Sequence, residues 1–129
     1  MLRGKIYNSE RARQLRDFSG LRFGNITPTD IDGMIEYKNI GYIIIELKYD
    51  DNELPHGQQL ALERLTDDLE RAGKKTLCIV ATHDTTNPED YIDVANAIVT
   101  SCRYKRVWQQ GSGYKTVREL IAWFISKIE

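Results

Sequence analysis

The residues best suited to chemistry stand in one part of the chain, on and just before the segment Tyr42–Tyr49. Glu46 and Lys48 belong to this segment, and Asp32 precedes it. The isoleucines of the segment predict a β-strand, and alternate residues of a strand point to the same face of a sheet. Glu46 and Lys48 are therefore expected side by side on one face of an otherwise apolar strand. Since a buried charge costs free energy unless it is paired, this pair should have either a partner or a function.

A hairpin would bring Asp32 to the same place. Residues 31–38 form a second predicted strand, and Asn39-Ile40-Gly41 separates it from the first. A three-residue connection with a late glycine is a favoured hairpin loop. If the residues on either side of this loop face each other, Asp32 falls opposite Lys48 and diagonal to Glu46, on the same face. A two-residue loop would turn Asp32 to the other face, so the predicted convergence depends on the register.

Two carboxylates and a lysine on one face indicate hydrolysis assisted by a metal ion. Asp32 and Glu46 would repel each other unless a divalent cation lay between them, and hard oxygen ligands suit Mg²⁺ or Mn²⁺. Such an ion lowers the pKa of a bound water and shields the oxygens of a phosphate. Lys48 could orient that water or stabilise charge on the phosphate. The backbone carbonyl of Leu47 could complete the metal shell.

The elements that position these residues follow from turn residues and apolar periodicity. The predicted segments are a helix over 8–17, strands over 21–26, 31–38 and 42–49, a helix over 57–72 and a strand over 76–82. A C-terminal strand over 104–109 and a helix capped by Thr116 follow, while residues 91–103 fit a helix or a strand. The helix between the third and fourth strands implies parallel neighbours, and hence an α/β fold with a mixed central sheet flanked by helices.

An acid early in a strand, followed by a hairpin to Glu-x-Lys on the next strand, resembles the PD-(D/E)XK nuclease superfamily. The order α-β-β-β-α-β over residues 8–82 is similar to the restriction-endonuclease-like core of that superfamily and covers more than half of the chain. No subfamily is assigned, although the chain resembles small restriction-endonuclease-like and Holliday-junction-resolvase-like nucleases. It departs from the pattern at Ile31, which stands where the proline of the motif's name would precede the acid.

The resemblance implies Asp32 and Glu46 as metal ligands, Lys48 as the catalytic lysine and a phosphodiester as the substrate. It also implies a catalytic glutamine in the helix after the Glu-x-Lys strand, where Gln58 is the preferred one of two neighbouring glutamines. A further metal ligand on the first helix would be Glu10. The expected activity is that of a Mg²⁺-dependent endonuclease acting on DNA, with RNA left open. We also expect a homodimer, as is usual for enzymes of the superfamily that cut both strands, and an origin in a phage or other mobile element.

Charge along the chain is uneven, although the net charge is −1. Residues 1–24 carry six basic and two acidic side chains. Residues 25–70 carry three basic and eleven acidic side chains, and residues 102–118 carry five basic and no acidic ones. An acidic middle between basic ends fits a metal site flanked by phosphate-binding surfaces, but chance clustering of solvated faces gives the same pattern. Residues 103–108 interleave cations with aromatics, which suits either a nucleic-acid contact or an amphipathic edge strand. The candidate nucleic-acid contacts are Arg11, Arg13, Arg103, Lys105, Arg106, Trp108 and Lys115.

Length and composition predict one nuclease-like domain over residues 1–129. No apolar run approaches the roughly 20 residues of a membrane span, and the N-terminus lacks the apolar core of a signal peptide. The two cysteines, Cys78 and Cys102, have no metal-ligand spacing. These features favour a cytoplasmic protein with reduced thiols and no membrane partner.

Two other interpretations fit the same residues. A nuclease-like domain that has lost catalysis would bind nucleic acid or a protein partner, although an intact Asp-Glu-Lys set argues against a dead site. A purely structural α/β protein would carry the three side chains on different faces. The register of the hairpin separates this last interpretation from the others.

Overall fold

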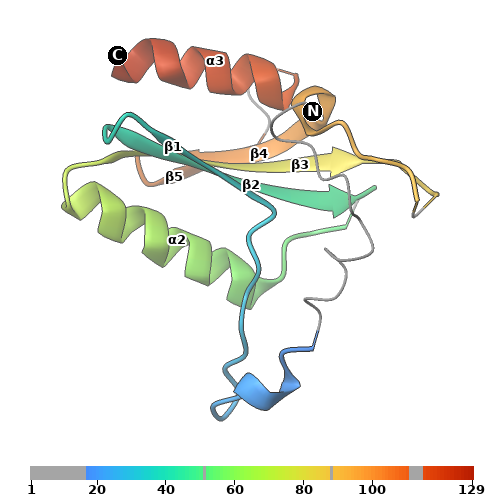
Figure 1. The fold of residues 1–129 in the computed structure, drawn as a ribbon. Helices are drawn as coiled ribbons and strands as arrows, with labels where there is room; N and C mark the ends of the chain where they lie inside the picture. The colour runs from blue at the N-terminus through green and yellow to red at the C-terminus, as the bar shows by residue number, and fades with distance from the viewer. Residues whose placement is uncertain (1–16, 51, 88, 111–114) are drawn as a thin grey trace. The chain divides into compact units, whose positions relative to one another are not determined.

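A computed structural model describes residues 17–50, 52–87, 89–110 and 115–129 of the chain. By its contacts the chain divides into two compact units, Met1–Asp30 and Ile31–Glu129. The second unit holds the sheet and the two long helices of the described residues (Figure 1). Apart from Asp17, the predicted helix over 8–17 lies outside the described residues, together with its candidate site residues Glu10, Arg11 and Arg13. A single domain over 1–129 stays a prediction.

In the first unit, the predicted strand over 21–26 is wrong. A single 3-10 turn, η1 (Ser19–Leu21), is followed by a tight loop in which Phe23 and Ile26 exchange both backbone hydrogen bonds. Gly24 has a φ of 63°, so the chain reverses where a strand would have to continue. Two strands rather than three therefore precede the crossover helix in the described residues, and the predicted order α-β-β-β-α-β is not reproduced there.

The second unit is an α/β fold with a mixed sheet, as predicted. The five strands lie in the order β1-β2-β3-β4-β5, and β2 and β3 are parallel while the other neighbours are antiparallel. The elements are β1 (Gly33–Tyr37), β2 (Gly41–Tyr49), α2 (His56–Arg71), β3 (Lys75–His83), η2 (Val94–Asn96), β4 (Ile98–Tyr104), β5 (Val107–Gln110) and α3 (Val117–Ile128). The helix α2 makes the predicted crossover between the two parallel strands, because parallel neighbours cannot be joined by a tight turn.

Helices α2 and α3 cover opposite faces of the sheet (Figure 1). Ile43 and Ile45 of β2 belong to a buried cluster that includes Phe124 of α3. Ile44, between them in sequence, belongs to a second cluster with Leu62 of α2. The alternation predicted for β2 is therefore confirmed, and it assigns the even-numbered residues of this strand to the α2 side.

The hairpin that joins β1 to β2 has the predicted parity but a register shifted by two residues. Tyr37 faces Gly41, and the last paired residues are Gly33 and Ile45. Continuing this register by one residue places Asp32 opposite Glu46, so the predicted position opposite Lys48 is wrong. An even shift keeps a residue on the same face, which is why the convergence of the three side chains survives.

The physical cause of the shift lies in the turn itself. Lys38 and Asn39 adopt φ values of 49° and 60°, and Ile40 closes the turn by donating to the carbonyl of Tyr37 (2.8 Å). Gly41, expected as the last loop residue, is instead the first residue of β2. A Cβ atom there would lie 2.8 Å from the carbonyl oxygen of Lys75 and 3.1 Å from Ile128 Cδ1. The absence of a side chain at Gly41 therefore allows β2 and β3 to approach closely, and it is not required by the turn.

The C-terminal part also differs in detail from prediction. The segment over 91–103, which fitted either element, holds η2 and most of β4. The predicted strand over 104–109 is divided, because Lys105 and Arg106 have φ values of 51° and 67° and turn the chain between β4 and β5. The last helix begins as predicted, with Thr116 Oγ1 accepting from the backbone N–H of Glu119 at 3.2 Å. No helix within the described ranges is both long and apolar enough to cross a bilayer.

The close approach at Gly41 predicts that Gly41→Ala destabilises the fold. A methyl group 2.8 Å from Lys75 O would push β2 away from β3, at a cost of about 1–3 kcal/mol in the free energy of unfolding. Urea denaturation followed by circular dichroism measures this loss. Gly57→Ala is the control, since a Cβ at this position in α2 meets nothing within 4 Å. A Gly41→Ala protein as stable as the control would contradict the assignment.

Candidate active site

A carboxylate lies buried at the centre of the candidate site. Glu46 projects from β2 toward the α2 side and is 1% exposed. Its Oε2 accepts a hydrogen bond of 2.7 Å from the side-chain amide of Gln58. Gln58 stands in the first turn of α2, so the crossover helix begins directly over the acid. The buried charge is thus held by a group that only the tertiary fold could bring there.

The same amide holds the lysine. Lys48, two residues along β2 from Glu46, donates from Nζ to Gln58 Oε1 at 3.0 Å. Gln58 therefore presents its NH₂ to the acid and its carbonyl oxygen to the cation, which is the orientation that both charges require. Its neighbour Gln59 turns away and donates to Glu63 on the same helix at 3.2 Å. Of the two glutamines, the structure brings Gln58 to the predicted acid and lysine.

The second acid is tied to the edge of β2. Asp32 directly precedes the first residue of β1 and is exposed. Its Oδ2 accepts from the backbone N–H of Leu47 at 2.8 Å. Leu47 lies beyond the last residue of β2 that pairs with β1, because β1 begins only at Gly33. The backbone N–H of Asp32 points to Glu46 Oε1 at 3.4 Å. Two hydrogen bonds thus hold Asp32 against Glu46 and Leu47, the two residues of β2 that were predicted to bind the metal with it.

Three groups in this region carry oxygen atoms that could bind a cation: the carboxylates of Asp32 and Glu46 and the backbone carbonyl of Leu47. A residue in a strand points its N–H and C=O toward the same neighbour, so the Leu47 carbonyl lies on the edge that Asp32 occupies. Asp32 accepts the Leu47 bond on Oδ2 and Glu46 accepts bonds on both oxygens, whereas an ionised carboxylate offers about four lone-pair sites. Within the described part of the chain, no group of three or more His, Cys, Asp or Glu side chains could hold a metal ion. Two carboxylates and a carbonyl still suit Mg²⁺, which usually keeps several waters.

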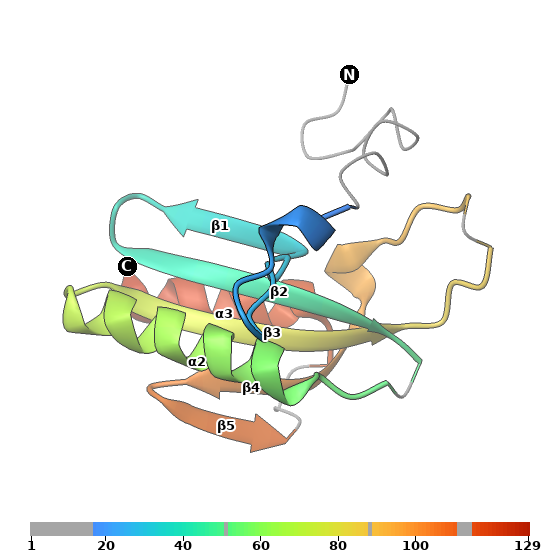
Figure 2. The same cartoon turned by 90° about the horizontal axis from the view of Figure 1, so that it is seen from below.

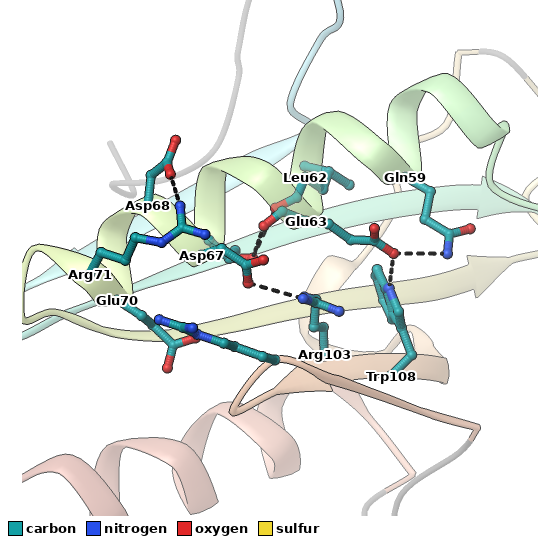
Figure 3. A network of polar contacts seen from close by, with 11 residues as sticks. Gln59, Leu62, Glu63, Asp67, Asp68, Glu70, Arg71, Arg103 and Trp108 are labelled. Atoms are coloured by element: carbon teal, nitrogen blue, oxygen red, sulfur yellow. Dashed lines mark hydrogen bonds and ion pairs between the residues drawn. The ribbon is translucent and has the colours of Figure 1, made fainter.

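The basic and aromatic stretch before and within β5 is used largely inside the protein. Trp108 donates from Nε1 to Glu63 Oε1 at 2.6 Å, and Arg103 donates from Nη2 to Asp67 Oδ1 at 3.0 Å (Figure 3). The Arg103 side chain is 11% exposed and lies 5.9 Å from the centre of the Trp108 ring. These contacts favour the amphipathic-strand interpretation for this pair, which fastens the β4–β5 hairpin to α2.

The acidic residues of α2 that contact this basic and aromatic stretch were not predicted from the sequence. Glu63, Asp67 and Glu70 stand one turn apart on α2, and the last lies 4.0 Å from Arg106 Nε. Their spacing of four and then three residues marks one helix face, and it is the available signal that this face meets a basic partner. Lys105, Arg106 and Lys115 are exposed, so their contact with nucleic acid stays a prediction.

Comparison with protein-family models, with curated proteins and with solved structures found no match to this chain. The candidate site therefore rests on its own geometry.

The bridging role of Gln58 predicts that Gln58→Leu destabilises the protein. The variant keeps the size of the side chain but removes the amide that joins Glu46 and Lys48, and hydrogen bonds to charged groups contribute about 1.5–3 kcal/mol each. We expect a loss of about 2–3 kcal/mol in the free energy of unfolding, measured by urea denaturation. Gln59→Leu, which removes only a bond within α2, should cost well under about 1 kcal/mol. Equal losses in the two variants would rule out the bridge.

Burial beside Glu46 also predicts a pH dependence. Burial, with the Glu46 charge as a smaller cause, raises the pKa of Cys78 from 9.0 to about 12. The folded state therefore holds this proton more tightly than the unfolded state, and the resulting stability is complete below pH 9 and is lost as the pH rises toward 12. At pH 10.5 the loss attributable to this thiol should be about 2 kcal/mol.

The measurement compares the parent chain with Cys78→Ala by urea denaturation from pH 7.5 to 10.5 under reducing conditions. Other groups titrate alike in both proteins, so only the difference between the two curves reports Cys78. A difference that does not change with pH would show that the thiol is not desolvated as the structure has it.

Proposed function

We propose that this chain is a metal-dependent nuclease that hydrolyses phosphodiester bonds in DNA. The observation that supports this most is the linked set Lys48–Gln58–Glu46 with Asp32 beside it. Asp32 directly precedes β1, Glu46 and Lys48 lie on β2, and Gln58 lies on α2. The resemblance to PD-(D/E)XK nucleases gives each of the four a role. The restriction-endonuclease-like topology is part of the proposal for this unit.

Asp32 and Glu46 would hold Mg²⁺, with the carbonyl of Leu47 as a third donor on the same strand edge. The ion would supply a water of lowered pKa and a positive charge on the phosphate oxygens. Lys48 orients the attacking water or stabilises the negative charge that develops on the phosphate. Gln58 acts as a positioning residue, because its amide fixes both the acid and the lysine.

The cost of this arrangement argues for a function. Replacing a buried charged group with an apolar one of similar size is often neutral or stabilising, so structure alone does not require an acid at position 46. Ile44, in the equivalent orientation one repeat earlier on β2, serves packing against α2. A carboxylate, an amide and a lysine in succession on this face are therefore better explained by chemistry than by folding.

The test is cleavage of supercoiled plasmid and of labelled single-stranded, duplex and branched DNA. We expect cleavage with Mg²⁺ or Mn²⁺ that EDTA abolishes. Lys48→Met and Asp32→Asn should each lower the rate by about 10²-fold or more, since each removes a group that acts on the transition state. Asp32→Asn should also weaken Mn²⁺ binding in a calorimetric titration, a readout that is independent of cleavage.

Lys127→Met and Asp68→Asn are matched controls, because both side chains are exposed and lie on α3 and on the outer part of α2. They should cleave like the parent protein. Cleavage that persists in EDTA, or that survives Lys48→Met, would overturn the proposal. Binding of DNA without cleavage in any divalent metal would instead support the inactive nucleic-acid-binding domain.

A further inference from the structure

A cavity of about 420 Å³ begins at Lys48 and runs away from the two acids across the sheet. Its size is within the range of sites that bind small organic groups. Seen from the α2 side, β4 and β5 lie to one side of this helix and β1 and β2 to the other (Figure 2). The cavity is lined by residues of β2, β3, β4 and β5, by the segment that leads into α2 and by Gln59 of α2.

The floor of the cavity continues the row of side chains that starts at Glu46. In the sheet register Glu46 faces Val80, Val80 faces Ser101, and Ser101 faces Gln110. Paired residues share a face, so all four point to the α2 side, and the last three line the cavity. The candidate active site and the cavity are therefore neighbouring parts of one continuous row.

A bulge shapes this floor. The register between β3 and β4 shifts after Val80, so that Thr100 is an extra residue on β4. Its hydroxyl donates to the backbone carbonyl of Val80 at 3.1 Å, and both residues line the cavity. Bulges inside a sheet re-aim side chains and are frequent beside functional sites. Here the bulge puts consecutive hydroxyls, those of Thr100 and Ser101, against one cavity.

The walls of the cavity combine an aromatic ring and an aliphatic side chain. Trp108 and Leu54 line it, and both pack against the buried cluster under α2. The indole N–H of Trp108 is committed to Glu63. What Trp108 offers to the cavity is therefore ring surface held in a fixed orientation, which suits contact with a flat, uncharged group.

The charges at the rim limit what can enter. Among the described residues that line the cavity, Asp50 and Glu53 are acidic and only Lys48 is basic, and Lys48 already faces the proposed phosphate position. A second phosphate would meet a net negative rim. A neutral group with several donors and acceptors would instead find Ser101, Thr100 and Gln110 on the floor. A nucleobase has this combination of flat surface and polar edges.

We infer that this cavity binds the base of one unpaired nucleotide whose phosphate lies at Lys48. The inference rests on the proposed function, because it takes the substrate to be a nucleic acid strand. It adds that the strand is engaged at an unstacked base, so single-stranded or distorted DNA is preferred to a regular duplex. A base held in this way would place its own phosphate at the linked acid and lysine.

The experiment uses the full chain with Ca²⁺ in place of Mg²⁺ and a set of single-stranded 12-mers. Each 12-mer carries 2-aminopurine at a different position, and a matching set carries an abasic site at the same position. We expect a change in fluorescence at one position and about tenfold weaker binding when the base there is absent. Ser101→Leu, which fills the floor, should remove both effects, whereas Ser126→Leu on the outer surface of α3 should remove neither.

Gln110→Ala gives a second variant, which takes a polar group from the same floor without adding bulk, in case Ser101→Leu does not fold. A uniform fluorescence response along the 12-mer, or parent-like binding by both floor variants, would overturn the inference. If the chain cleaves DNA but tolerates an abasic site everywhere, the base site is wrong and the nuclease proposal stands. If one base is bound but nothing is cleaved, the cavity inference stands and the nuclease proposal fails.

Discussion

The burial of one carboxylate in the middle of a central strand constrains everything around it. Glu46 sits in β2 at 1% exposure, where an isolated charge would cost several kcal/mol in desolvation. The fold meets this cost with hydrogen-bond donors from two directions, the Gln58 amide and the backbone of Asp32. The first ties the acid to α2 and the second ties it to the β1–β2 hairpin. Both elements must therefore be in place before the acid is stabilised, and the acid in turn fixes their relative positions.

The parallel pairing of β2 and β3 is what brings α2 to this acid. A parallel connection needs a crossover, and a helix that returns along the sheet covers one face of the two strands that it joins. Gly41 and Lys75 begin the two strands at the same level, and their backbones lie so close that a Cβ atom at position 41 would force a shift. That contact sets the β2–β3 register, and the register sets which residues of β2 lie under the first turn of the helix. A steric constraint at one end of the strand is thus transmitted to the site near the other end.

Much of this site was predictable because it depends on short-range periodicity. Strand alternation put Glu46 and Lys48 on one face, and hairpin parity put Asp32 with them, although the turn shifted the pairing by two residues. The shift was not predictable, since it depends on Lys38 accepting a left-handed conformation. The predicted strand over 21–26 is wrong for a related reason, because Gly24 adopts a left-handed conformation and reverses the chain.

The long-range contacts were harder to predict than the local ones. Arg103 and Trp108 carry the residue types of a nucleic-acid surface, yet the acids of α2 neutralise this arginine inside the protein. Nothing local to residues 103–108 shows that α2 passes beside them, because that proximity arises only when β3 pairs with β4. The side chain of Gln58 could be selected only through the resemblance, since its distance from Glu46 in the sequence carries no periodicity.

The position at which α2 begins determines which residues on this face of the sheet are packed under the helix and which face the cavity. Under the helix, the row from Ile44 through Cys78 to Arg103 and Trp108 is closed by apolar contact and by the ion pair with Asp67. The next row, from Glu46 to Gln110, is buried at Glu46 and Val80 and opens toward the cavity at Ser101 and Gln110. Pro55 caps the helix at this boundary with a ψ of 145°, and the residue before a proline disfavours helical geometry. Had the helix begun a turn earlier, it would have extended over the second row, so the proline keeps the polar row open beside the acid and the lysine.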